Sequence, residues 1–165
     1  MSARVAKILM VASLAAFGWV VTYDNIIDYG ANYGFVSHVL SMDTTFPDSV
    51  LRARAITDPL LWRRAYMLII GVEGLTALCF TLGALSLLFR LGTGSIRFDR
   101  AKGLTVLGAT LAFLLWFTGF MVLGGEWFAM WQSKLWNGQE AAFRFYMTAL
   151  AVLIFVNQPE RDPPG

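Results

Sequence analysis

The chain has 165 residues, of which 57% are hydrophobic and only 15% are charged, and its formal net charge is +2. Soluble domains carry about 25% charged residues, so this composition excludes an ordinary soluble domain and predicts an integral membrane protein. Nucleic-acid binding depends on a clear excess of basic residues, and this net charge is too small to provide one, so we expect no nucleic-acid partner.

The apolar residues fall into long segments that suit membrane-spanning helices, which need about 20 residues each. The first segment follows a basic start, but it continues past the core of a signal peptide and runs into Trp19 and Tyr23, which favours a retained span. Within it, Ala12, Ala16 and Trp19 share one face, which we expect to pack against another helix. The predicted fold is an all-α membrane protein, a four-transmembrane-helix bundle in one domain (1–165), with spans at about 5–23, 65–89, 103–125 and 141–156.

The connections between the spans indicate the orientation of the chain. The short connection 90–102 holds four basic residues, and short loops weigh most in the positive-inside rule. We therefore expect this connection and both termini in the cytoplasm. The two aromatic connections, 24–64 and 126–140, then face outward and contact the lipid headgroups.

The first outer connection predicts short helices of its own. Phe35, Val39 and Met42 stand at helical spacing, which is typical of a short helix at the membrane surface. A second short helix is expected within 44–56. The sequence Thr57-Asp58-Pro59, a capping residue followed by proline, predicts the start of the second long helix.

Two outer segments carry a family resemblance. DYGANYGFVSHVLSMDTTFP (28–47) and GGEWFAMWQSKLWNGQEAAFRF (124–145) resemble those of a bacterial family of predicted small integral membrane proteins of unknown function. The resemblance covers the chain from Tyr23 through the fourth span. It implies a four-helix protein of the bacterial cytoplasmic (inner) membrane, and it implies no activity, cofactor or catalytic residue.

Glu73 and Arg144 are the charges that lie most clearly within the spans. A charge at this depth is costly unless it is paired or faces water. Glu73 shares a face with Thr76 and Ala77, and Arg144 shares one with Thr148, so both are expected to face the interior. We predict an intramembrane ion pair between Glu73 and Arg144. The alternatives are a proton or ligand site, or an uncoupled, protonated Glu73 with Arg144 reaching toward the interface.

A second group of polar residues belongs to the first outer connection. Asp24 and Asp28 share a helix face, and paired carboxylates suit acid–base work or a cation, although a solvated helix end is the commoner role. His38 is the only histidine, so this chain offers no pair of histidines for a haem. His38, Met42 and Asp43 are weak metal candidates, set against an interfacial packing histidine. We predict no metal site and no cofactor, and we treat Asp24, Asp28, His38 and Asp43 as a candidate outer polar cluster.

Three tryptophans, Trp127, Trp131 and Trp136, follow the third span. They predict either an interfacial anchor or a surface on which a protein partner or lipid docks.

The sequence contains no HExxH, GxSxG or P-loop motif and gives no catalytic residue. It favours a non-catalytic accessory or assembly subunit of a larger membrane complex, with respiratory complexes as one case, and therefore a protein partner within the membrane. One alternative is a small transporter or an ion- or proton-conducting protein built on Glu73 and Arg144. The other is a membrane enzyme that acts on lipid or quinone at the outer interface.

Overall fold

The computed structural model describes residues 2–160, and every regular element within them is helical. Four helical segments are long and apolar enough to cross a membrane, as the composition predicts. They are α1 (Ser2–Ile27), α3 (Pro59–Phe89), the run from Ser95 to Trp127 that comprises α4 (Ser95–Arg100), α5 (Gly103–Phe113) and η2 (Leu114–Trp127), and α6 (Gln139–Asn157). The shorter elements are α2 (Tyr29–Ser41), η1 (Val50–Arg54) and η3 (Met130–Gln132).

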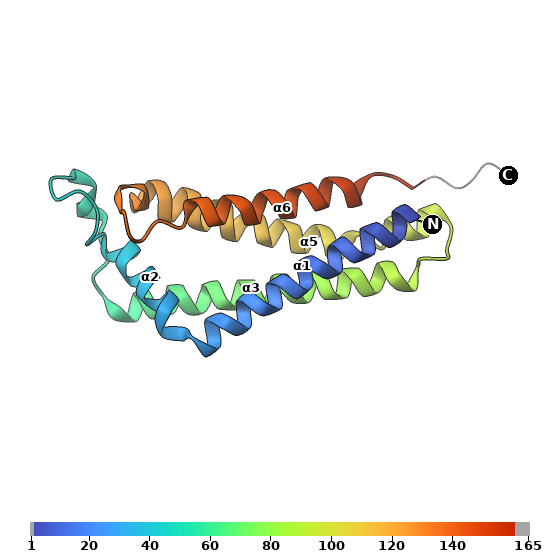
Figure 1. Cartoon of the computed structure of the whole chain (residues 1–165), viewed down its shortest axis with the longest axis horizontal. Coiled ribbons are helices and arrows are strands. Elements are labelled where there is room, and N and C mark those ends of the chain that lie inside the picture. Colours follow the sequence, from blue (N-terminus) through green and yellow to red (C-terminus); the bar gives the residue numbers. More distant parts are fainter. Residues whose placement is uncertain (1, 161–165) are drawn as a thin grey trace.

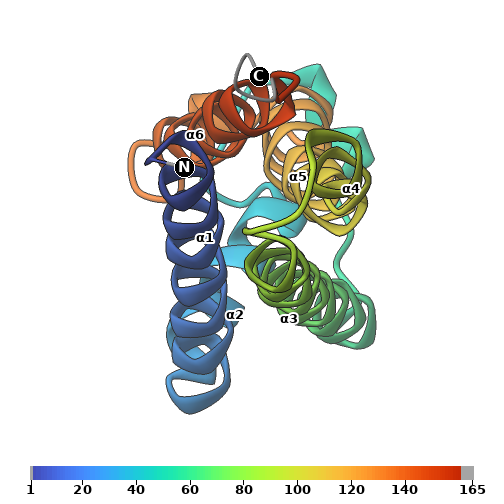
Figure 2. The ribbon, with the colours of Figure 1, turned by 90° about the vertical axis from the view of Figure 1, so that its right-hand side faces the viewer.

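The long helices lie lengthwise beside one another, and the molecule has two distinct ends (Figure 1). The start of α1, the end of α6 and the connection 90–102 lie at one end, here called the termini end. The elements α2, η1 and η3 lie at the other, here called the loop end. Helix α1 lies beside α6 at the termini end and diverges from it toward the loop end, as the view along the helices also shows (Figures 1 and 2).

Local sequence explains the boundaries of α3 and α2. Helix α3 begins where the sequence predicts, because the Asp58 carboxylate accepts a hydrogen bond from the Leu60 amide at 2.8 Å and Pro59 occupies the first turn. Helix α2 ends at Met42, whose positive φ of 53° closes the last turn onto the Val39 carbonyl. Val39 and Met42 then pack against Phe128, so α2 covers the loop end of the long helices.

Helix α1 packs closely along α3. A Cβ added at Gly18 would lie 2.9 Å from Ala77 Cβ and 3.2 Å from Ala77 Cα, so only glycine allows this approach. Small residues at such crossings are how membrane helices gain close contact. The face expected from the sequence is wrong, because Ala12 and Ala16 are exposed. The buried face lies beside it and comprises Val11, Ala15, Gly18, Thr22 and Asn25.

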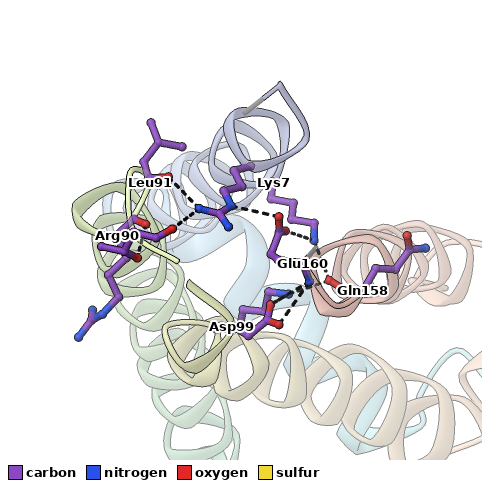
Figure 3. A network of polar contacts seen from close by, with 9 residues as sticks. Lys7, Arg90, Leu91, Asp99, Gln158 and Glu160 are labelled. Carbon is purple, nitrogen blue, oxygen red and sulfur yellow. Dashed lines mark hydrogen bonds and ion pairs between the residues drawn. The ribbon is translucent and has the colours of Figure 1, made fainter. Parts of the chain in front are cut away.

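A network of charged residues fastens the termini end (Figure 3). Lys7 Nζ donates to the Gln158 carbonyl at 2.8 Å and pairs with Glu160 Oε1 at 2.6 Å. Arg4 pairs with Glu160 Oε2 at 3.1 Å and donates to the carbonyls of Leu91 and Thr93, at 3.1 and 2.5 Å. These contacts join the start of α1, the connection before α4 and the segment after α6.

The connection 90–102 adds a second set of contacts to this network. Lys102 Nζ pairs with Asp99 at 2.6 Å and donates to the Gln158 carbonyl at 2.8 Å. We call the whole set the terminal clasp; it comprises Arg4, Lys7, Asp99, Lys102, Gln158 and Glu160. The sequence indicates orientation through the connection 90–102, which includes Lys102, but it gives no sign that Lys102, Arg4 and Lys7 hold the helix ends together, as they do in the structure.

The terminal clasp perturbs the ionisation of Glu160. Burial by itself would raise the pKa of the Glu160 carboxyl. Hydrogen bonds from Lys7 and Arg4, with their positive charges, outweigh burial and lower this pKa below its ordinary value. A lowered carboxyl pKa stabilises the folded state at neutral pH, and this stability is lost as pH falls through the lowered pKa.

Replacing Gly18 with alanine should destabilise the protein. The new Cβ would force α1 and α3 apart, at a cost of about 1–3 kcal/mol in the free energy of unfolding. Gly71→Ala on α3 is the matched control, because a Cβ there meets nothing within 4 Å and alanine favours a helix by up to about 1 kcal/mol. Thermal unfolding in mild detergent measures both variants. Equal shifts would show that the α1–α3 approach is not tight.

Replacing Glu160 with glutamine should lower the free energy of unfolding at neutral pH by about 1.5–3 kcal/mol, since charged hydrogen bonds to Lys7 and Arg4 are lost. The difference between wild type and Glu160→Gln should shrink as pH falls below the ordinary glutamate pKa of about 4.3. Unfolding midpoints measured across this pH range give the comparison. The exposed Glu140→Gln serves as control and should change stability by less than about 1 kcal/mol. A difference that does not depend on pH would refute an ionised Glu160.

Candidate functional site

A half-open cavity of about 350 Å³ lies among α1, α2, α3, η2 and α6, on the loop-end side of the α1–α3 crossing. We call it the Glu73 pocket. Its walls include the aromatic side chains Phe35, Trp116, Phe120 and Phe145. Its polar lining residues are Asp24, Asn25, Asn32, Tyr66 and Glu73.

The close packing of α1 on α3 positions the polar residues of this pocket. With Gly18 against Ala77, the last turns of α1 lie beside the middle of α3, and Asn25 meets Glu73. Asn25 Nδ2 donates to Glu73 Oε2 at 2.7 Å. Helix α2 then turns back over this point and adds Asn32, whose amide donates to Asn25 Oδ1 at 2.5 Å.

Tyr66 completes the hydrogen-bond chain from α3. Its hydroxyl lies 3.1 Å from both the Asn25 carbonyl and Asn25 Oδ1. Because Asn25 Oδ1 accepts from Asn32 and Tyr66, the Asn25 amide nitrogen is oriented toward Glu73. Asn25 on α1 therefore connects Asn32 on α2 and Tyr66 on α3 to the Glu73 carboxyl group.

Glu73 is only 3% exposed, and the residues around it that the structure describes offer few hydrogen-bond donors and no cation that could stabilise a charged carboxylate. Among the described residues its one side-chain hydrogen bond comes from the neutral amide of Asn25, and it forms no ion pair. A buried carboxylate is costly unless it is paired with a cation or fully hydrogen-bonded. The site therefore has unused capacity to bind a donor or a cation.

The pocket opens sideways, between α1 and α6. Asp24 on α1, Asn32 on α2 and Ala141 on α6 line it and are all exposed, whereas Asn25 and Glu73 are buried at its floor. The two helices diverge toward this end of the molecule (Figure 1). Helices α1 and α6 are both long and apolar enough to span a membrane, and the mouth residues Asp24 and Ala141 lie at the loop-end limits of the spans expected from the sequence.

A second cavity, of about 410 Å³, lies among α2, α3 and η2 and is almost wholly apolar. It shares Phe35, Val36, Ile69 and Phe120 with the Glu73 pocket. These four side chains therefore form a shared wall between the polar Glu73 pocket and the apolar cavity, and both cavities lie in the loop-end half of the molecule.

The structure does not bring Glu73 and Arg144 together. Glu73 lies on the buried face of α3 with Thr76 and Ala77, as expected, but Arg144 lies on the exposed face of α6 with Thr148. Arg144 forms its ion pair with Glu140, one helical turn earlier. The rotation of α6 about its axis is set by Ala142, Tyr146, Ala149, Val152 and Val156, which it buries instead.

The members of the outer polar cluster are divided between two places. Asp24 lines the mouth of the Glu73 pocket, and Asp28 is exposed outside it. His38 Nδ1 lies 2.7 Å from Asp43 Oδ2, and the His38 ring stacks on Trp136 with centroids 4.7 Å apart. His38 therefore packs at the loop end.

The metal candidates do not form a ligand set. Met42 is fully buried in the core with Phe128 and Met130, so it does not share an exposed site with His38 and Asp43. Among residues 2–160, no group of three or more His, Cys, Asp or Glu could hold a metal ion.

The three tryptophans have different environments. Trp136 is half-buried against His38 and Phe35. Trp127 is 52% exposed beneath the guanidinium of Arg54, 4.5 Å from the ring centroid, and Trp131 is 49% exposed. Only the latter two remain free to contact lipid or a partner.

Asn25, Asn32 and Tyr66 are site residues that sequence reasoning missed. The signal for Asn25 is its position in a buried repeat with alternating spacings of four and three residues, namely Val11, Ala15, Gly18, Thr22 and Asn25. An amide at the end of such a stripe, inside or near a span, indicates a buried polar contact. Asn32 and Tyr66 carry no comparable signal, because Asn32 reaches the site only when α2 folds back over α1 and Tyr66 only through the packing of α3 on α1.

Four apolar helices that enclose a polar cavity define an integral membrane protein. The sequence model of the family described as predicted small integral membrane protein (DUF2165) matches residues 3–159, and the chain belongs to this family. No curated protein and no solved structure matches the chain.

A double-mutant cycle distinguishes the two partners considered for Glu73. Asn25→Ala and Glu73→Ala should couple by about 0.5–3 kcal/mol in the free energy of unfolding, because each change removes one partner of their hydrogen bond. Glu73→Gln and Arg144→Gln share no contact and should add within about 0.5 kcal/mol. Chemical or thermal unfolding in detergent provides the values. Strong coupling between Glu73 and Arg144 would restore the ion pair expected from the sequence.

Proposed function

We propose that the protein is a non-catalytic binding protein of the bacterial cytoplasmic membrane, which takes a small amphiphilic molecule from the surrounding lipid into the Glu73 pocket. The observation that carries this proposal is a buried carboxylate at the floor of a cavity whose mouth lies between two spanning helices. Ligand pockets combine apolar walls with a few convergent polar groups in this way.

The orientation that we propose places the termini end in the cytoplasm. Arg90, Arg97 and Arg100 are exposed at that end, and clustered basic residues beside spanning helices favour the cytoplasmic side. The loop end then faces outward, and the Glu73 pocket opens within the outer leaflet.

The packing below the pocket favours binding over conduction. Toward the termini end, Phe80, Ala84 and Leu87 on α3 are buried in one apolar core with residues of α1, α5 and α6. This core separates Glu73 from the termini end. A termini-end half that is packed in this way suits a ligand that enters and leaves from the same leaflet. It is a poor route for a proton or ion.

The lining also favours binding over catalysis. It offers carboxylates, amides and one hydroxyl, and it contains no His, Cys, Ser or Lys that could pair as base and nucleophile. Asp24 and Glu73 belong to the mouth and the floor, respectively. We therefore assign them to recognition.

A second candidate function is an accessory or assembly subunit of a larger membrane complex, for example a respiratory one. Exposed aromatic side chains at the loop end favour it: Phe46 is 52% exposed and contacts Trp131 edge-on, with ring centroids 5.9 Å apart, and Trp127 is also exposed. Aromatic residues of this kind are enriched at the cores of protein interfaces. The two candidates are compatible, since a subunit can also hold a ligand.

A bulky side chain at the mouth of the Glu73 pocket should prevent the ligand from binding. Ala141→Trp places a large side chain at the exposed rim, and Ala151→Trp is the matched control, because Ala151 is exposed on the same helix and does not line the pocket. Native mass spectrometry of the protein purified from its own membranes should find a small bound molecule in the wild type and in Ala151→Trp. Ala141→Trp should lose it.

The same purification, in mild detergent, separates the two candidate functions. Equal occupancy in all three proteins, or none in the wild type, would contradict the binding function. A stable stoichiometric protein partner would support the accessory-subunit function, and a clean homo-oligomer would contradict it.

A further inference from the structure

The Glu73 pocket contains two carboxylates and no positive charge. Asp24 stands at its mouth and Glu73 at its floor, with the amides of Asn25 and Asn32 and the Tyr66 hydroxyl between them. No Lys, Arg or His is among its lining residues. A recess lined by one sign of charge, with low-dielectric walls, concentrates ions of the opposite sign.

The floor of the pocket shows what a ligand must supply. Glu73 receives a hydrogen bond from the neutral amide of Asn25 and pairs with no cation among the described residues. By contrast, Glu160 in the terminal clasp is paired with both Lys7 and Arg4. A positively charged ligand group would give Glu73 the partner that this chain does not provide.

The walls favour an organic cation over a metal ion. Five lining side chains are aromatic: Phe35, Tyr66, Trp116, Phe120 and Phe145. Aromatic rings beside a carboxylate suit an ammonium group through cation–π attraction. The cavity, at about 350 Å³, also exceeds the volume of one water, about 30 Å³, by roughly tenfold, whereas a metal ion needs oxygen ligands gathered closely around it.

The surroundings of the mouth restrict the rest of the ligand. The mouth residues Asp24 and Ala141 lie at the loop-end limits of two helices that can span a membrane, so an attached alkyl chain can extend along these helices into the bilayer while the head reaches Glu73. A zwitterionic phospholipid would bring a phosphate close to Asp24 with no basic side chain among the lining residues to receive it. A head that is cationic and carries no phosphate avoids this repulsion.

We propose that the Glu73 pocket binds an organic ammonium group, with Glu73 as its counter-charge and Asp24 attracting it at the mouth. This inference rests on the proposed binding function and names the class of its ligand. The ammonium group can belong to a long-chain amine or quaternary ammonium amphiphile in the membrane, or to a small cation from water. The two sources share one recognition chemistry and differ in the alkyl chain.

The test measures binding of defined probes to the full chain in phospholipid nanodiscs, by native mass spectrometry and by the shift in thermal unfolding. The probes are dodecyltrimethylammonium, the neutral dodecanol, the anionic dodecyl sulfate, and tetramethylammonium without a chain. Dodecyltrimethylammonium should bind saturably and at least about tenfold more tightly than the neutral and anionic probes. Tighter binding of the long-chain cation than of tetramethylammonium identifies a membrane amphiphile, and equal binding identifies a water-soluble ammonium.

Matched variants assign the binding to Glu73. Glu73→Gln should weaken binding of dodecyltrimethylammonium by about tenfold or more, because a charged partner is lost. Glu140→Gln, an exposed glutamate on α6 outside the pocket, should leave it unchanged. Asp24→Asn at the exposed rim keeps the floor intact and should weaken binding about two- to fivefold at low salt. If Glu73→Gln does not fold, the affinity of Asp24→Asn for dodecyltrimethylammonium provides the test.

Two failures can be told apart. If the neutral or anionic probe binds as tightly as the cation and Ala141→Trp blocks them all, the pocket binds ligands but the ammonium inference is overturned. The same holds if Glu73→Gln and Asp24→Asn leave the cation affinity unchanged. If Ala141→Trp changes the binding of none of the probes, the proposed binding function itself fails.

Discussion

The close approach of α1 to α3 at Gly18 and Ala77 is the contact on which the other features depend. It fixes the register of the two antiparallel helices, and the consequences appear at both ends. At one end Arg4 reaches the carbonyls of Leu91 and Thr93. At the other, Asn25 meets Glu73. A helix crossing made of small side chains thus sets the positions of polar groups that lie between about one turn (Glu73) and about four turns (Arg4) away.

The two ends of the molecule use charge in opposite ways. In the terminal clasp, Glu160 forms ion pairs with Lys7 and Arg4. Their role is structural, because they hold together helix ends that are far apart in sequence. In the Glu73 pocket, the carboxylate has a neutral partner and an open side. A buried carboxyl group that the fold pairs with cations contributes to structure, whereas one that the fold leaves with a single neutral partner is available for recognition. This contrast is why the pocket, and not the terminal clasp, is the candidate site.

The sequence predicts much of the fold, because long apolar segments and the Asp58–Pro59 helix start are local signals. It also predicts that Glu73 faces the interior, through its stripe of small residues. It does not predict the partner of Glu73, because the rotation of α6 depends on packing that a single helix does not reveal. The pairing of Arg144 with Glu140 was nevertheless visible as two opposite charges one helical turn apart. The π-helical run η2 (Leu114–Trp127) has no sequence signature of comparable clarity, since extended π-helices are rare.

The unequal lengths of the spanning helices have a consequence for the bilayer around them. Helix α6 has 19 residues and α3 has 31, which at 1.5 Å per residue correspond to about 28 Å and 46 Å. Helix α6 therefore only just matches a hydrocarbon core of about 30 Å, and α3 exceeds it. Helix α3 can then tilt or project from the hydrocarbon core, whereas α6 has no length in excess of it. The two helices therefore differ in how much of their length a bilayer of one thickness can cover.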